Sequence, residues 1–429
     1  MKLLFPYLAR WRSANRSRYH QLLTQLCLQG HQVYVLKAPP MALKDISATD
    51  LEGSMAPALP TGLTLIELYA SPMLRTFWRM PIPKSKMVKK GLLCISSVDQ
   101  VRRFVDDNQI DALLVYNLPQ VSLLSKVNCH KHFDLADDLV AMMDQESGLV
   151  SRVGGTAAAR YAQARMLTQA DTVTVASSVL AEQIDRQVFM LPNGADLTEL
   201  DQADGSEWRS RNLGPCVGFV GAFEYWVDFE LILGLARRLP TVRFLLVGGG
   251  RRWMDVKQAV EKQGLQNVHL MGAVSYRQAM NYAAAMDVCL LPFTHDPVSD
   301  GSCPLKLFEY AALRKPIIST TTREVERIGK GWVEFADDVA GFAEAVEYFL
   351  SSPAVAARAG EAGRAIVEEY YNWPALARQF VEYLTLGTVP SLAEVARTPA
   401  LGTFISNPGR LISDSDKLGL APRHGLASD

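Results

Sequence analysis

Residues 300–318 read DGSCPLKLFEYAALRKPII, a polar turn followed by an apolar helical segment and a short apolar strand. Pro304 suits the first turn of a helix, where its missing N–H group is not needed. The free amides of such a helix start, together with the helix dipole, favour an anion. Lys306 adds a positive charge, and Glu309 could accept hydrogen bonds from ligand hydroxyls. Spacing alone favours the simpler interpretation, a capped surface helix with Glu309 on its polar face.

Short apolar runs alternate with amphipathic segments on both sides of this stretch. In the second half, the pattern predicts strands at Cys216–Val220, Arg243–Val247, Asn267–Met271, Val288–Phe293 and Pro316–Ser319. The helices predicted there are Asp228–Arg238, Tyr276–Met286, Pro304–Leu313, Val339–Leu350 and Ala354–Glu369. The first half predicts a helix at Ser17–Leu28 and strands at Lys2–Leu8, Gln32–Leu36, Ala112–Tyr116, His132–Leu135, Thr172–Ala176 and Phe189–Leu191. This rhythm predicts two Rossmann-like halves, each a parallel sheet covered by helices.

Length and composition limit the alternatives. The 429 residues correspond to two domains, or three, and 48% hydrophobic residues suffice for a proper core. A net charge of −1 gives no support for nucleic acid as a partner. The six cysteines include no CxxC pair, so neither a disulfide framework nor a structural zinc site is expected. Without an apolar run of about 18–20 residues or a signal-peptide layout, we expect a cytoplasmic protein, soluble or peripheral to a membrane.

The 300–318 stretch resembles the donor-binding motif of GT-B glycosyltransferases, in particular the retaining family 4 (group 1) enzymes. Glu309 matches the second glutamate of the family's Glu-x7-Glu pair, which binds the donor ribose, and Gly301 stands where the first glutamate is usual. The form Ser-x-Pro-x-Lys-x-x-Glu-Tyr-x-Ala is similar to that of teichuronic-acid and exopolysaccharide enzymes. The resemblance implies a nucleotide-sugar donor as co-substrate, no cofactor and no metal ion.

Other segments carry the same resemblance. Residues 191–196 match the Pro-Asn-Gly-Val-Asp element that enters the interdomain linker, and Tyr371–Pro374 match the entry to a last helix that crosses back to the first domain. Residues 217–232 match the first strand, loop and helix of the C-terminal domain. The Arg and Lys that this loop usually offers to the donor diphosphate are replaced by Glu224, Trp226 and Asp228.

This exchange leaves a deficit of positive charge that other residues would have to fill. Arg16 and Arg18 follow the first strand and could neutralise a diphosphate, although a solvated basic loop explains them equally well. In Gly248–Arg252, the glycine run forms either a tight turn or a phosphate cradle with one of the two arginines. The predicted donor-binding residues are Arg16, Arg18, Gly221, Gly249, Arg251, Ser302, Cys303, Lys306 and Glu309.

Carboxylates gather after another predicted strand, in Phe133–Leu139. Three of them so close should raise at least one pKa unless they are paired. The segment resembles the Tyr-Asp-x-x-Asp-Asp element of the same subgroup, which favours Asp137 or Asp138 as a catalytic residue that positions the acceptor or handles a proton. The alternative is that Asp138 caps the following helix.

Residues 71–90 mix large apolar side chains, among them Met73, Leu74, Phe77, Trp78 and Met80, with six cations and contain no acid. Such a segment suits contact with an anionic membrane, and a covered loop with solvated lysines is the alternative. The seven histidines form no clear metal-binding cluster, and no Gly-x-Ser-x-Gly elbow supports a hydrolase.

Taken together, the sequence predicts an α/β protein with the GT-B fold, two Rossmann-like domains with a cleft between them. Residues 1–200 form the acceptor-side domain, residues 206–370 the nucleotide-sugar-binding domain, residues 371–386 the helix that crosses back and residues 387–429 a mobile tail. The expected activity is transfer of a sugar from a nucleotide-sugar to a glycan or lipid-linked acceptor, in polysaccharide or glycoconjugate biosynthesis. A nucleotide-sugar epimerase of the same fold and a non-catalytic binding subunit are the alternatives.

Overall fold

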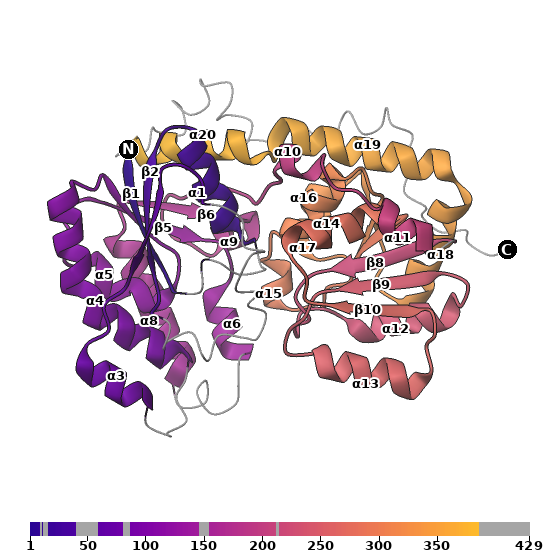
Figure 1. The fold of residues 1–429 in the computed structure, drawn as a ribbon, viewed down its shortest axis with the longest axis horizontal. Helices are drawn as coiled ribbons and strands as arrows, with labels where there is room; N and C mark the ends of the chain where they lie inside the picture. Colours follow the sequence, from indigo (N-terminus) through magenta and orange to yellow (C-terminus); the bar gives the residue numbers. More distant parts are fainter. Residues whose placement is uncertain are drawn as a thin grey trace.

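Two parallel sheets form the framework of the chain in the computed structural model (Figure 1). The structure describes residues 1–8, 11, 16–39, 59–79, 86–145, 154–211 and 214–385. The predicted tail and residues 80–85 of the basic apolar segment lie outside this set. Each sheet is covered by helices on both faces, and the two units lie side by side. The prediction of two Rossmann-like domains is confirmed.

The N-terminal sheet has seven strands in the order β3-β2-β1-β4-β5-β6-β7, all parallel. Its strands are β1 (Lys2–Tyr7), β2 (Gln32–Lys37), β3 (Leu63–Glu67), β4 (Ala112–Val115), β5 (His130–Leu135), β6 (Thr172–Val175) and β7 (Phe189–Met190). The helices are α1 (Arg18–Leu28), α3 (Pro72–Arg79), α4 (Lys86–Asn108), α5 (Val121–Leu124), α6 (Leu139–Gln145), α8 (Thr156–Gln169) and α9 (Ser178–Glu182), with the 3₁₀ turn η1 (Leu118–Gln120). In such a sheet, ligands bind beyond the carboxyl ends of the strands.

The C-terminal sheet has six parallel strands in the order β10-β9-β8-β11-β12-β13. They are β8 (Cys216–Val220), β9 (Arg243–Val247), β10 (Val268–Gly272), β11 (Val288–Leu291), β12 (Ile317–Ser319) and β13 (Val333–Phe335). The helices are α12 (Phe229–Arg238), α13 (Trp253–Gln263), α14 (Tyr276–Ala285), α15 (Pro297–Asp300), α16 (Leu305–Ala312), α17 (Arg323–Gly329), α18 (Val339–Ser351) and α19 (Pro353–Tyr370). The quoted stretch therefore forms α16 and β12, as predicted.

The chain passes between the two units twice, and the two passages lie side by side. Ala195 N donates to Tyr371 O at 2.8 Å, and Trp373 N donates to Ala195 O at 3.1 Å. After the second passage, α20 (Trp373–Thr385) returns to the N-terminal unit beside α1 (Figure 1). Trp373 and Phe380 of α20 are buried in one apolar cluster with Leu22 and Leu26 of α1.

Several elements escape the sequence pattern. No strand or helix is predicted between Leu36 and Ala112, yet this part of the chain contains β3, α3 and the 23-residue helix α4. The stretch 193–213, which includes the expected boundary between residues 200 and 206, contains the short helices α10 (Leu197–Leu200) and α11 (Ser206–Arg211). β13 has only three residues, which is too short for an alternating pattern to be recognised.

Candidate active site

The start of α16 lies on the side of the C-terminal unit that contacts the N-terminal unit. Pro304 is the N-cap, and no side chain caps the helix. Among the described residues, the amides of Leu305 and Lys306 therefore have no acceptor within the helix or from a capping group. This uncapped start provides an electropositive, hydrogen-bonding surface of the kind that binds phosphate.

Glu309 is fully buried one turn into α16, and both of its carboxylate oxygens have partners. Lys306 Nζ donates to Oε2 at 2.6 Å, and Tyr276 Oη, from the start of α14, donates to Oε1 at 2.9 Å. Burial and the nearby Glu309 raise the pKa of Tyr276 well above its ordinary value, so the phenol keeps its proton. Ligand hydroxyls can reach Glu309 only where they replace one of these partners.

Arg16 brings the N-terminal unit to this cluster. Its guanidinium pairs with Glu199 of α10, lies 3.8 Å from Asp196 Oδ2, and is centred 5.5 Å from the middle of the Tyr276 ring. Burial raises the pKa of Glu199, and the charge of Arg16 opposes this rise. Arg16 thus links the first unit, the linker and α14, at the place where the sequence predicts a donor-binding cation.

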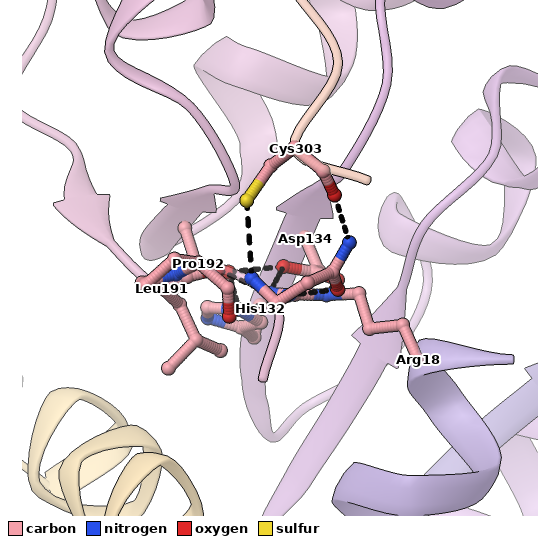
Figure 2. Close-up of polar contacts among 8 residues, drawn as sticks. Arg18, His132, Asp134, Leu191, Pro192 and Cys303 are labelled. Carbon is pink, nitrogen blue, oxygen red and sulfur yellow. Dashed lines mark hydrogen bonds and ion pairs between the residues drawn. The ribbon is translucent and has the colours of Figure 1, made fainter. Parts of the chain in front are cut away.

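Arg18 has a different position from the one predicted. It is buried, and all five of its N–H groups donate within the protein (Figure 2). Nε and Nη2 bind the two oxygens of Asp134 at 2.8 and 2.9 Å. The remaining bonds reach the segment after β7, namely Leu191 O at 2.7 Å, Pro192 O at 3.0 Å and Asn193 Oδ1 at 3.0 Å. Because all five N–H groups are engaged, Arg18 has no donor left for a phosphate in this arrangement. Such complete pairing is expected, since an unpaired N–H group of a buried guanidinium is costly.

The three carboxylates in and directly after β5 have different environments. Asp134 is buried, and the guanidinium of Arg18 holds its pKa below the ordinary value against the effect of burial. Asp138 Oδ1 accepts from Ala141 N at 2.8 Å, so Asp138 caps α6, as the capping interpretation predicts. Asp137 is exposed and makes no hydrogen bond or ion pair with any described residue. Although Asp137 is exposed, desolvation by the protein around it raises its pKa; Arg18 opposes this rise, and Asp134 and Asp138 add to it.

Ser302 and Cys303 lie in the turn that leads into α16. The Cys303 carbonyl accepts a hydrogen bond from Asn193 Nδ2, and the Cys303 thiol is buried with its pKa raised to about 12, chiefly by burial. The thiol is therefore no nucleophile near neutral pH. The carbonyl of Gly301, which replaces the family's first glutamate, accepts from Ser177 Oγ of the N-terminal unit at 2.7 Å.

The glycines after β8 and β9 pack against each other. A Cβ on Gly248 would lie 1.8 Å from the carbonyl oxygen of Gly221. The carbonyl of Gly249 accepts from Phe223 N at 3.0 Å. Arg251 Nε donates to Glu224 Oε2. These contacts account for the glycine run as a tight turn, and they pair Arg251 with an acid of the loop where the family has basic residues.

Two residues of the site have no counterpart in the sequence-based prediction. Tyr276 follows Ser275, whose capping box with Gln278 marks a helix start after β10 and could have drawn attention to it. Asn193 belongs to the linker motif, but its contact with Cys303 joins residues 110 positions apart. Such a contact leaves no local signal in the sequence.

Within the described residues, no group of three His, Cys, Asp or Glu side chains is arranged to hold a metal ion. In the same part of the chain, no helix is both long and apolar enough to cross a lipid bilayer.

The arrangement can now be compared with known proteins. Residues 214–352 match the family model described as glycosyl transferases group 1. These matched residues make up most of the C-terminal unit and are called the group 1 domain below, for their similarity to that family. They contain the uncapped start of α16, Lys306, Glu309 and Tyr276.

Two curated relatives agree with this assignment. The chain is 28% identical over 234 residues to TuaH of Bacillus subtilis, named as a teichuronic acid biosynthesis glycosyltransferase. It is 23% identical over 239 residues to O-antigen chain mannosyltransferase C of Escherichia coli. The aligned regions cover 51% and 52% of this chain, and 58% and 62% of those relatives. The chain thus spans less than two thirds of the length of either relative.

The similarity to solved structures extends over both domains of the chain. Sucrose-phosphate synthase from Thermosynechococcus elongatus has a TM-score of 0.70 at 19% identity, with 89% of this chain and 97% of that chain covered. HepE of Anabaena, solved in complex with UDP-glucose, has a TM-score of 0.64 at 15% identity, with 90% of this chain and 100% of that chain covered. The lipopolysaccharide glycosyltransferase WaaG has a TM-score of 0.62 at 13% identity, with coverage of 89% and 99%. These similarities establish the GT-B fold.

Proposed function

We propose that the chain transfers a glycosyl group from a nucleotide-sugar to a glycan or lipid-linked acceptor, in the biosynthesis of a polysaccharide or glycoconjugate. One observation carries the proposal. The group 1 domain presents an uncapped helix start with Lys306 and Glu309 beside it, facing residues of the other domain. The relatives named for teichuronic acid and O-antigen biosynthesis support the class of product.

On the donor side, the diphosphate would lie against the first turn of α16. The free amides, Lys306 and Arg16 would neutralise its charge. Among the described residues, Arg16 pairs with Glu199 and lies near Asp196, and these contacts do not use all of its N–H groups. The ribose hydroxyls would replace Tyr276 Oη at Glu309. These groups favour the departing nucleoside diphosphate, whose charge grows as the glycosidic bond breaks. Retention at the sugar carbon follows from the family resemblance alone.

On the acceptor side, Asp137 is the strongest candidate. It is an exposed and unpaired carboxylate at the carboxyl end of β5, with its pKa raised. A carboxylate of this kind can accept a hydrogen bond from an acceptor hydroxyl and orient it. Asp138 is less suitable, because one of its oxygens caps α6.

Nucleotide binding tests the donor side. We expect one member of a panel of UDP, GDP and ADP, with their sugar derivatives, to raise the melting temperature of the chain. Glu309→Gln should weaken binding of that nucleotide about tenfold, because a charged acceptor for the ribose is lost. Glu326→Gln, which changes an exposed carboxylate of α17, is the matched control. An unchanged shift for Glu309→Gln would refute the placement of the ribose.

Product analysis separates the proposed activity from its alternatives. A transferase needs an acceptor, whereas an epimerase changes the sugar of the nucleotide-sugar without one. A binding subunit would bind the nucleotide-sugar and would catalyse neither the transfer nor the epimerisation. Gly301, in place of the first family glutamate, is the feature that favours this last outcome.

We further propose that the N-terminal domain meets the cytoplasmic face of an anionic membrane, where a lipid-linked acceptor would be found. Four large apolar side chains on and before α3 and α4 are exposed: Tyr69 by 49%, Met73 by 82%, Val88 by 51% and Ile95 by 61%. Exposed arginines at 75, 102 and 103 belong to the same helices. Apolar side chains mixed with cations match the interface of an anionic bilayer.

Vesicle sedimentation tests this contact. The native chain should bind vesicles of phosphatidylglycerol and phosphatidylcholine more strongly than vesicles of phosphatidylcholine alone. The double variant Met73→Asp with Val88→Asp should lose most of this binding. Met254→Asp, at a side chain exposed by 55% on the C-terminal domain, serves as the control. Equal binding of both variants would contradict the proposed surface.

A further inference from the structure

A buried chain of hydrogen bonds runs from the N-terminal sheet to the start of α16 (Figure 2). It begins in β6 and β5, where His132 Nε2 lies 2.9 Å from Thr174 Oγ1 and Thr174 Oγ1 donates to Asp134 Oδ1 at 2.6 Å. Asp134 then accepts two bonds from Arg18. His132 is buried, and burial lowers its pKa to about 3, so it is neutral near neutral pH.

Arg18 joins this sheet to both passages of the chain between the domains. On the first passage, it donates to Leu191 O, Pro192 O and Asn193 Oδ1. On the second, its guanidinium is centred 5.9 Å from the middle of the Trp373 ring. A planar guanidinium holds its partners in fixed directions, and a lysine has no equivalent geometry. Arg18 therefore fixes the direction in which the chain leaves the first domain.

Asn193 carries the connection into the second domain. Its side-chain oxygen accepts from Arg18 Nη1 at 3.0 Å, and its Nδ2 group donates to the carbonyl of Cys303. Its backbone N–H group lies 3.5 Å from Cys303 Sγ. Cys303 directly precedes Pro304, the N-cap of α16. The amide of Asn193 thus joins the guanidinium that is paired with Asp134 to the residue before the helix start.

We propose that Arg18 and Asn193 are positioning residues for the transfer reaction, which fix the start of α16 relative to the sheet that carries Asp137. Neither residue needs to touch the substrate. They hold the proposed phosphate site and the proposed acceptor carboxylate in one geometry, and small errors in such a geometry are costly in rate. This inference rests on the proposed function, since it assumes that a donor binds at α16.

Asn193→Asp gives a sharp test. The carboxylate still offers an oxygen to Arg18, but it presents an acceptor to the carbonyl of Cys303 in place of the Nδ2 donor. Asn267→Asp is the matched control. Asn267 Nδ2 donates to three carbonyls inside the C-terminal domain, those of Ala236, Leu239 and Val242. These bonds involve neither Arg18 and Asn193, which we call the hinge, nor the start of α16. Both variants lose donated hydrogen bonds, so both lower stability, and they are compared below their melting temperatures.

We expect Asn193→Asp to raise the donor KM about tenfold, in line with the loss of one buried hydrogen bond. It should also speed hydrogen exchange in residues 302–307, measured without nucleotide. Asn267→Asp should change neither quantity. If Asn193→Asp does not fold, Asn193→Ser, whose hydroxyl is too short for the Cys303 carbonyl, replaces it with the same expectations.

Unchanged exchange in residues 302–307 together with an unchanged donor KM would overturn the inference. An equal effect of Asn267→Asp on both quantities would also overturn it, because the effect would then follow from lost stability. The proposed function fails separately, if the native chain binds none of UDP, GDP and ADP. In that case the exchange measurement still decides whether Asn193 fixes the helix start.

Discussion

At the scale of single residues, burial decides which charged groups remain available for chemistry. Arg18 and Asp134 lie beneath the surface and satisfy each other, so they act as structure. Asp137 lies three positions after Asp134, remains exposed and has no partner among the described residues. Its raised pKa means that the fold disfavours its charge. A group kept at a cost to stability is a candidate for function.

Asp137→Asn should separate the contribution of Asp137 to turnover from its cost to stability. If Asp137 orients the acceptor hydroxyl, turnover should fall about a hundredfold. The melting temperature at pH 7 should be at least that of the native chain, because a carboxylate with a raised pKa destabilises the folded state above its ordinary pKa. In the native chain, activity should decline on acidification from a higher pH than an ordinary aspartate would cause. Full turnover in the variant would remove Asp137 from the mechanism.

At Glu309 the phenol of Tyr276 stands where the ribose is proposed to bind. Tyr276→Phe should therefore free one carboxylate oxygen and strengthen nucleotide binding a few-fold, measured by calorimetry with the nucleotide that gave the largest thermal shift. Ring packing against Arg16 is retained in this variant. Weaker binding would mean that the hydroxyl itself contacts the donor.

At the scale of elements, the sequence predicts well what depends on local periodicity. β8, β9 and α1 lie within a residue or two of their predicted bounds. The sequence could not reveal the partners of Arg18, because they come from β5 and from the segment after β7, far away in the sequence. The sequence could not decide whether the glycine run forms a tight turn or a phosphate cradle, because the two have the same composition. The approach of Gly248 to Gly221, together with the hydrogen bond from Phe223 N to Gly249 O, favours the turn.

Gly248→Ala measures that approach. Gly248 has a φ of +138°, and a Cβ there would overlap the carbonyl of Gly221 at 1.8 Å. Two loops must move, so we expect a loss of about 3 kcal/mol in the free energy of unfolding. Gly264→Ala, at a φ of +63° with nothing within 4 Å of its Cβ, should lose only about 1 kcal/mol. Equal losses in urea denaturation would show that the loops are not tightly packed.

At the scale of the whole molecule, the domains meet at a second place besides the two passages. Ser178 donates to Glu324 Oε2 from its backbone N–H at 3.1 Å and from its hydroxyl at 2.7 Å, and Arg327 pairs with Oε1 of the same carboxylate. Ala176, beside this contact, belongs to the apolar core of the second domain. The orientation of the domains therefore depends on a buried carboxylate as well as on the hinge.

Glu324→Gln should loosen this orientation, because it weakens charged hydrogen bonds that lie out of water, each contributing about 1.5–3 kcal/mol. The radius of gyration in small-angle X-ray scattering should rise, and the spread of conformations should narrow again when the nucleotide is added. Glu182→Gln breaks an ion pair with Arg323 across the same interface, but both side chains are more than half exposed. Such a pair contributes only about 0–1 kcal/mol, so this variant should scatter like the native chain. Identical scattering from Glu324→Gln would leave the hinge at Arg18 and Asn193 as the element that sets the domain orientation.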